Sequence, residues 1–193
     1  MCWRFILAGI ALIALAACGG PAQDAVPSGE PDDILFEVAP STPPPPLPDA
    51  VIQTRDELLA IADRNSLRAL ARRADAEPVF LSNLGSDDHY GHWDLMRRTG
   101  FDPNTKLQDL FRQPHGVRRV GAETWYIWPD LAALPAEDLA PERLSFQDAA
   151  RLRSLVGEQG LAQIEAGQSY PGVRTAISES GAWRYFLHET PSE

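Results

Sequence analysis

Apolar side chains recur every three or four residues in several stretches of the chain, and this spacing predicts amphipathic helices. The first helix is expected to begin at Thr54, because a hydroxyl three residues before Glu57 has the spacing of a capping box. Asn65 and Ser66 predict a break before a second helix. Further helices are expected over residues 92–99, 103–111 and 145–155, followed by a short one around Leu161 and Ile164.

Two blocks of sequence alternate instead with a period of two and carry β-branched and aromatic residues, as strands do. The first block pairs residues 116–120 with residues 124–128, and the second pairs residues 172–178 with residues 183–187. A short turn containing glycine separates each pair, so each block predicts a β-hairpin. An internal duplication and two unrelated hairpins would both produce this likeness. Helices before and between two hairpins predict an α+β fold, with helices packed on an antiparallel sheet made of two β-hairpins.

The alternation also predicts which side chains share a face of the sheet. Trp125 and Ile127 are expected on one face of the first hairpin. Tyr126 and Trp128 are expected on the opposite face, so this part of the sheet is either covered on both sides or exposes an aromatic strip. In the last hairpin, one face is expected to carry Trp183, Tyr185 and Leu187, and the other Arg184, Phe186 and His188. The last hairpin is therefore predicted to be half-polar.

Residues 1–17 have the pattern of a secretory signal. Arg4 precedes 13 residues, Phe5 to Ala17, that include no polar side chain. This run is shorter than the roughly 20 residues that a membrane span needs. It ends in Leu15-Ala16-Ala17-Cys18-Gly19-Gly20, where small residues let the chain enter a narrow peptidase site. These residues resemble the lipobox of bacterial lipoproteins. The resemblance implies cleavage before Cys18, a diacylglycerol on its thiol and a fatty acid on the new N-terminus. An ordinary signal peptide is the alternative.

Residues 18–50 are predicted to form a tether between that anchor and the rest of the chain. They hold nine of the 17 prolines and six acidic side chains but no lysine or arginine, so they bury too little apolar surface to fold. The apolar run 34–38 is either an extra edge strand or a docking segment for a partner. Residues 51–193 remain as a single α+β domain. By analogy with lipoproteins, Gly19 favours the outer over the inner membrane of the cell envelope, because an aspartate there commonly retains such proteins at the inner membrane.

Charge and cysteine content narrow the range of functions. The formal net charge is -10, which has the wrong sign for a nucleic-acid-binding protein. Cys2 would leave with the signal, so the domain has no cysteine for a disulfide or a thiol nucleophile. The serine motif Gly-x-Ser-x-Gly and the phosphate-binding glycine patterns are missing from the sequence. No cofactor is predicted.

One polar cluster carries groups that can bind a metal ion. His89 and His92 are three residues apart, so both would lie on one face of a helix that began early enough, and Asp88 could complete the site. Asp87 and Asp88 fit equally well as caps of the helix that follows. A metal-dependent envelope hydrolase that uses Asp88, His89 and His92 is therefore one hypothesis for the function.

The arginines favour a second hypothesis, in which the domain binds a ligand. Only Lys106 among the basic residues is a lysine, and the pair Arg118-Arg119 precedes Trp125 and Trp128 on the first hairpin. Guanidinium groups grip carboxylates and phosphates, and tryptophan faces stack on sugars. Ion pairing at the surface is the simpler interpretation of these arginines.

The favoured interpretation is a lipid-anchored envelope protein, held to the membrane through Cys18, whose domain binds a partner protein or a glycan without catalysis. Residues 91–95 and 125–129 resemble those of uncharacterised bacterial proteins, and that resemblance implies no activity.

Overall fold

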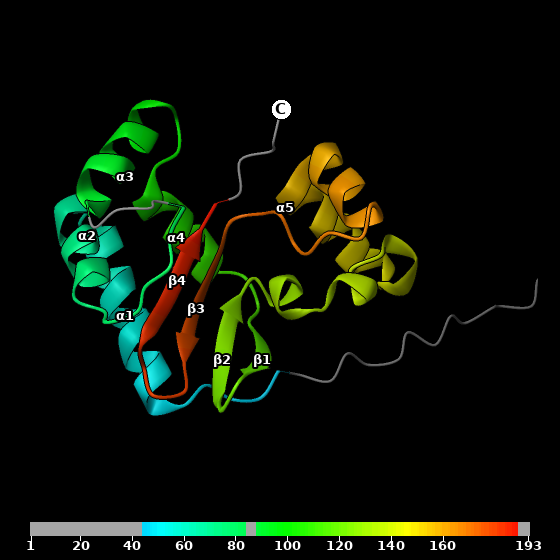
Figure 1. The fold of residues 1–193 in the computed structure, drawn as a ribbon, viewed down its shortest axis with the longest axis horizontal. Coiled ribbons are helices and arrows are strands. Elements are labelled where there is room, and N and C mark those ends of the chain that lie inside the picture. Colours follow the sequence, from blue (N-terminus) through cyan, green and yellow to red (C-terminus); the bar gives the residue numbers. More distant parts are fainter. Residues whose placement is uncertain (1–43, 84–87, 189–193) are drawn as a thin grey trace, which may run out of the picture. The chain divides into compact units, whose positions relative to one another are not determined.

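The computed structural model describes residues 44–83 and 88–188. The predicted signal, Cys18 and the apolar run 34–38 lie outside the described residues. Within the two described ranges, five α-helices, three short 3₁₀ helices and four strands follow one another (Figure 1). Helices long and apolar enough to cross a bilayer do not occur in these ranges.

The α-helices are α1 (Asp49–Asp63), α2 (Leu67–Asp75), α3 (His89–Arg98), α4 (Pro103–Phe111) and α5 (Phe146–Glu165). The strands are β1 (Gly116–Val120), β2 (Glu123–Trp128), β3 (Arg174–Ser178) and β4 (Trp183–Leu187). The 3₁₀ helices η1 (Asp130–Ala133), η2 (Ala136–Asp138) and η3 (Pro141–Arg143) connect β2 to α5. The strands form one antiparallel sheet in the order β1-β2-β3-β4. The predicted α+β fold and both predicted hairpins are confirmed.

Helix α1 begins earlier than its sequence pattern predicts. Its N-cap is Pro48, so the helix starts before the expected domain boundary at residue 51. Thr54 therefore lies inside the helix, where its buried Oγ1 donates a hydrogen bond of 2.7 Å to the carbonyl oxygen of Gly181. The predicted capping role of Thr54 is wrong, because this hydroxyl satisfies a carbonyl in the turn between β3 and β4 instead.

The other helix ends largely follow the sequence. Asp88, Asp102 and Ser145 cap α3, α4 and α5 through their side chains, and each accepts a hydrogen bond from a backbone N–H of the first turn. Helix α3 thus begins at His89, three residues earlier than expected. The two helices expected between residues 145 and 164 meet at a kink at Gly157, whose φ of 66° is readily adopted only by glycine.

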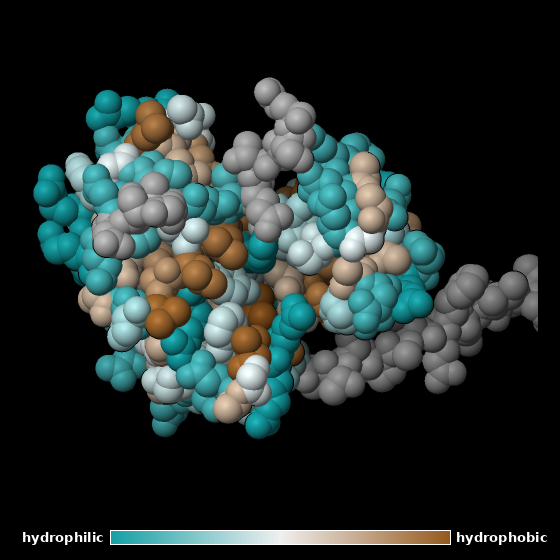
Figure 2. Space-filling view, in the orientation of Figure 1, coloured by the Kyte–Doolittle hydropathy of each residue, from teal (hydrophilic) through white to brown (hydrophobic). Residues whose placement is uncertain are grey.

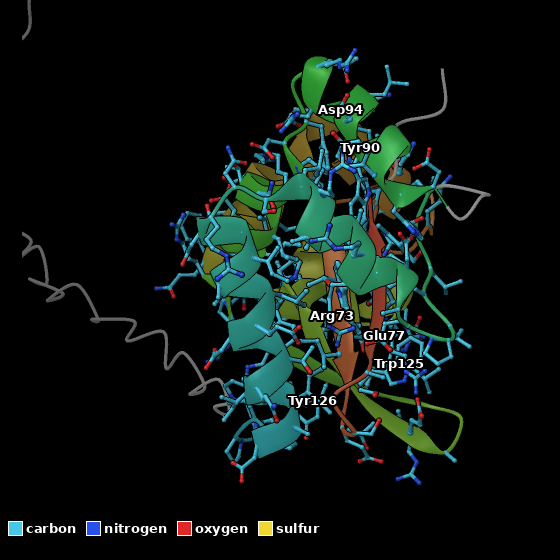
Figure 3. All side chains as sticks on the ribbon, turned by 90° about the vertical axis from the view of Figure 1, so that its left-hand side faces the viewer. Arg73, Glu77, Tyr90, Asp94, Trp125 and Tyr126 are labelled. Carbon is cyan, nitrogen blue, oxygen red and sulfur yellow. The ribbon has the colours of Figure 1, made fainter. Side chains whose placement is uncertain are left out.

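Strands β2, β3 and β4 are packed on both faces, as one of the two alternatives for the first hairpin predicts, whereas β1 is exposed along most of its length. Tyr126 and Trp128 pack among residues of α1, α2, α3 and α4. Ile127 and Tyr185 pack on the other face against residues of η1 and α5. Figure 1 shows α1, α2 and α3 on one side of the strands and α5 on the other. Figure 3 labels Trp125 and Tyr126, neighbours on β2 that pack with the core on the α5 side and with the core on the side of α1 to α4, respectively.

Strand β4 departs from simple alternation. Trp183 and Tyr185 pair with consecutive residues of β3, so Arg184 is an additional residue that forms a β-bulge. Trp183 and Phe186 both lie in the core on the side of α1 to α4, whereas Tyr185 lies on the side of α5. The expectation that Trp183 shares a face with Tyr185 is therefore wrong. The expected half-polar character is wrong as well, because all three aromatic side chains are buried.

Candidate functional site

The α5 side of the sheet contains a pocket of about 550 Å³, which we call the arginine–aromatic pocket. Its walls come from β1, β2, β3 and β4, from η1 and the residue that follows it, and from the chain after α5. The residues that supply its chemistry are Arg118, Arg119, Trp125, Tyr170, Arg174 and Tyr185. Figure 2 shows apolar residues over the strands, bordered by the hydrophilic surfaces of the helices on either side.

The antiparallel register aligns the arginine and the tryptophan of the first hairpin. Arg118 pairs with Trp125 across β1 and β2, and directly opposed residues of an antiparallel pair share a face. Trp125 Nε1 donates to Glu123 Oε2 at 3.0 Å, and Glu123 Oε1 accepts from Arg184 Nη2 at 2.5 Å. The guanidinium carbon of Arg184 lies 6.0 Å from the Trp125 ring centroid. These contacts fix the ring in the pocket wall.

The pocket is positively charged in a chain whose formal net charge is -10. Arg118, Arg119 and Arg174 line it, and no acidic residue does so among the described residues. Arg174 Nη1 donates to the carbonyl oxygens of Tyr170 and Gly172 at 2.9 and 3.2 Å. In residues 44–83 and 88–188, the exposed side chains of Arg118 and Arg119 form no ion pair or hydrogen bond. Two guanidinium groups are therefore open to a ligand.

The two tyrosines supply neutral hydroxyls. Burial raises the pKa of Tyr185 to about 12, against the opposing effect of the nearby Arg174 and Arg118 charges. Burial also raises the pKa of Tyr170, again opposed by Arg174. Both phenols therefore stay protonated at neutral pH, and a phenol can donate a hydrogen bond to an anion.

Trp128 does not belong to this pocket, although the sequence singled it out together with Arg118, Arg119 and Trp125. Trp128 lies on the face of the sheet that packs against α1 to α4, and only 2% of its surface is exposed. The Phe111 ring meets it edge-on with centroids 5.1 Å apart, and the His115 ring lies 5.7 Å away. The predicted ligand-binding role of Trp128 is wrong, because strand alternation places it opposite Trp125.

Two of the three predicted metal ligands, Asp88 and His89, have other partners in the structure. Asp88 Oδ1 accepts from the Gly91 N–H at 2.9 Å and caps α3. His89 is buried, and both of its ring nitrogens lie within hydrogen-bond distance of protein side chains. Burial and the neighbouring His89 lower the pKa of His92. Among the residues that the structure describes, no three His, Cys, Asp or Glu side chains are grouped as metal ligands, so the geometry does not support a metal centre.

The partners of His89 form a line of three polar side chains, which we call the Asp75–His89–Ser82 network. Asp75 Oδ1 lies 2.5 Å from His89 Nδ1, and Ser82 Oγ lies 3.1 Å from His89 Nε2. Asp75 ends α2, His89 begins α3, and Ser82 lies in the connection between them. Ser82 lies outside any Gly-x-Ser-x-Gly motif, so the sequence did not predict this network.

Comparisons of the chain with protein-family models, with curated proteins and with solved structures each find no significant match. The functional interpretation therefore rests on the geometry of these two sites.

The sequence did not predict Tyr170, Arg174 and Tyr185 as pocket residues. Their role depends on the pairing of β2 with β3, which joins segments about 50 residues apart and leaves no local signal in the sequence.

Proposed function

We propose that this chain is a lipid-anchored protein of the bacterial cell envelope whose domain binds an anionic glycan in the arginine–aromatic pocket. The observation that carries the proposal is the composition of the pocket. Three arginines line it together with Trp125 and two neutral tyrosines, and no acidic residue lines it within the described chain. The pocket acts by binding and does not itself catalyse a reaction.

The ligand class follows from what each group recognises. A guanidinium group offers parallel N–H donors that match the two oxygens of a carboxylate or phosphate. The indole ring of Trp125 offers a flat apolar face on which a sugar ring can stack. A saccharide that carries carboxylate groups meets both requirements. The negative charge of the rest of the chain would keep polyanions away from other parts of the surface.

The proposed anchor rests on Cys18 and the lipobox-like residues before it. Several acyl chains on one cysteine hold a protein at a membrane far more firmly than a single chain does. We expect Cys18→Ser to accumulate as an unprocessed precursor or to be released from the membrane. Cell fractionation and labelling with a radioactive fatty acid test this. A Cys18→Ser protein that still takes up the label and sediments with membranes would refute the anchor.

Binding can be tested by calorimetry on the full-length protein in a non-ionic detergent, with tri-galacturonate as the anionic probe and maltotriose as its neutral counterpart. We expect tri-galacturonate to bind and maltotriose to bind at least about tenfold more weakly, because hydrogen bonds to charged groups contribute about 1.5–3 kcal/mol each. Arg118→Gln should weaken tri-galacturonate binding by about 10- to 100-fold.

The matched control is Arg72→Gln, which removes an exposed arginine on α2 that does not line the pocket. It changes the net charge by the same amount, so it should leave the affinity nearly unchanged. Equal binding of the two trisaccharides, or equal losses in the two arginine variants, would contradict the proposed pocket. The anchor could still hold in that case, because it depends on Cys18 alone.

A further inference from the structure

The Asp75–His89–Ser82 network has the order and polarity of a Ser-His-Asp catalytic triad. In such a triad the carboxylate accepts from Nδ1–H of the histidine, and Nε2 accepts the hydroxyl proton of the serine. Here the carboxylate oxygen lies 2.5 Å from Nδ1, and the serine oxygen lies 3.1 Å from Nε2. A carboxylate at Nδ1 favours the tautomer whose Nε2 lone pair faces Ser82.

The surroundings hold the imidazole in this orientation. The Phe80 ring meets it edge-on with centroids 5.2 Å apart, and the Trp93 ring lies 5.4 Å away. Only 10% of the His89 side chain is exposed, whereas 41% of the Asp75 side chain is. Ser82 is partly exposed. The base is thus enclosed by aromatic walls, while the network reaches the surface where a substrate can approach.

We propose that Ser82, His89 and Asp75 form a nucleophilic site that hydrolyses carboxylic esters. Ser82 Oγ attacks the carbonyl carbon while His89 Nε2 takes its proton. The bond to the alcohol oxygen then breaks, and the same proton passes to the departing alcohol. Water next attacks the acyl carbon and gives a proton to His89. The acyl–Oγ bond breaks, the carboxylic acid leaves, and the proton returns to Ser82, so that one ester and one water yield one acid and one alcohol.

The exposure of the network indicates the substrate class, and its geometry gives the role of Asp75. Esters are more reactive than amides, and a partly hydrated site stabilises a tetrahedral oxyanion less than an enclosed one. Ser82, where the carbonyl carbon would be attacked, is partly exposed, so the site is partly hydrated, and this favours esters. Asp75 is a positioning residue, since it acts through His89 and does not touch the substrate. This activity is independent of the arginine–aromatic pocket.

The same three contacts could simply hold the end of α2, the connection and the start of α3 together, so the test must separate reactivity from stability. We would treat the full-length protein in detergent with a fluorophosphonate, which transfers its phosphonyl group to an activated serine and releases fluoride. Mass spectrometry of the intact protein and of its peptides should find one adduct, on Ser82. The protein should also hydrolyse p-nitrophenyl butyrate, and this activity should require Ser82 as the adduct does.

Ser82→Ala should abolish both signals, and Asp75→Asn should slow both by about 10²- to 10⁴-fold, as the loss of the carboxylate does in other triads. Asp75→Asn is the deciding variant, because its side chain is exposed and the amide can still contact His89. Its thermal unfolding should match that of the unaltered protein. The control His115→Gln alters another histidine, whose Nε2 contacts the Pro45 carbonyl oxygen, and should leave both signals unchanged. A folded protein that forms no adduct at Ser82, or Asp75→Asn that reacts at the original rate, would overturn the proposal.

Discussion

Replacing Trp128 by alanine removes one of the largest fully buried side chains of the domain. A tryptophan buries about 200 Å² of surface, which at about 25 cal/mol per Å² amounts to about 5 kcal/mol. Truncations of large aromatic residues in protein cores cost about 3–5 kcal/mol. The edge-on contact with Phe111 would also be lost. We therefore expect Trp128→Ala to lower the free energy of unfolding by about 4 kcal/mol.

Urea unfolding followed by far-ultraviolet circular dichroism measures this loss. With a denaturant dependence of about 2 kcal/mol per molar urea, the midpoint should fall by about 2 M. Small domains are stable by only about 5–15 kcal/mol, so the alanine variant could fail to fold. Trp128→Phe then serves as a milder variant. We expect it to lower the free energy of unfolding by about 1–2 kcal/mol.

Trp125→Ala provides the internal comparison, because Trp125 is only partly buried in the wall of the pocket. We expect Trp125→Ala to lower the free energy of unfolding by less than about 2 kcal/mol, because a partly buried side chain contributes less than a fully buried one. The assignment of Trp128 to the core and of Trp125 to the pocket would be refuted by equal losses at the two positions. A stability loss at Trp125 larger than that at Trp128 would refute it as well.

Two further predictions concern buried polar groups. Thr54→Val removes the hydroxyl that donates to the Gly181 carbonyl oxygen and should lower the free energy of unfolding by about 1–3 kcal/mol. Thr54→Ser keeps a hydroxyl and should retain most of the stability. Thermal unfolding of both variants measures the difference. Tyr185 has a pKa raised from 10 to about 12, so its contribution to stability is fully present below pH 10 and is lost as the pH rises from 10 to 12, by about 3 kcal/mol in all. Urea unfolding at these pH values should show the loss in the unaltered protein but a smaller one in Tyr185→Phe, and identical slopes would contradict the burial of this phenol.

The hairpins could be predicted because strand alternation and glycine turns are local features of the sequence. The same rule failed at Trp183, since a single extra residue in β4 reverses the alternation and nothing in the sequence around Arg184 marks the bulge. The start of α1 was missed for a related reason. Thr54 and Glu57 have the spacing of a cap, but a carbonyl at Gly181, far away in sequence, takes the threonine hydroxyl.

The candidate sites were predictable only where neighbours in sequence are also neighbours in space. Arg118 and Trp125 lie on one hairpin, so the sequence placed them together. Tyr185 and Arg174 enter the pocket through the last hairpin, whose position beside β2 is a long-range contact. Asp75, Ser82 and His89 are close in sequence, yet the line that they form requires the fold of α2 and α3.

The hydrogen bond from Thr54 to Gly181 also bears on the order in which the chain can fold. It joins residues 127 positions apart, and the core next to α1 is completed by Trp183 and Phe186 near the end of the chain. Contacts of such high sequence separation form late, because the loop between them must close first. A growing chain that still lacks the last hairpin leaves the apolar faces of its first helices uncovered. The domain can therefore reach its native state only after synthesis has passed β4.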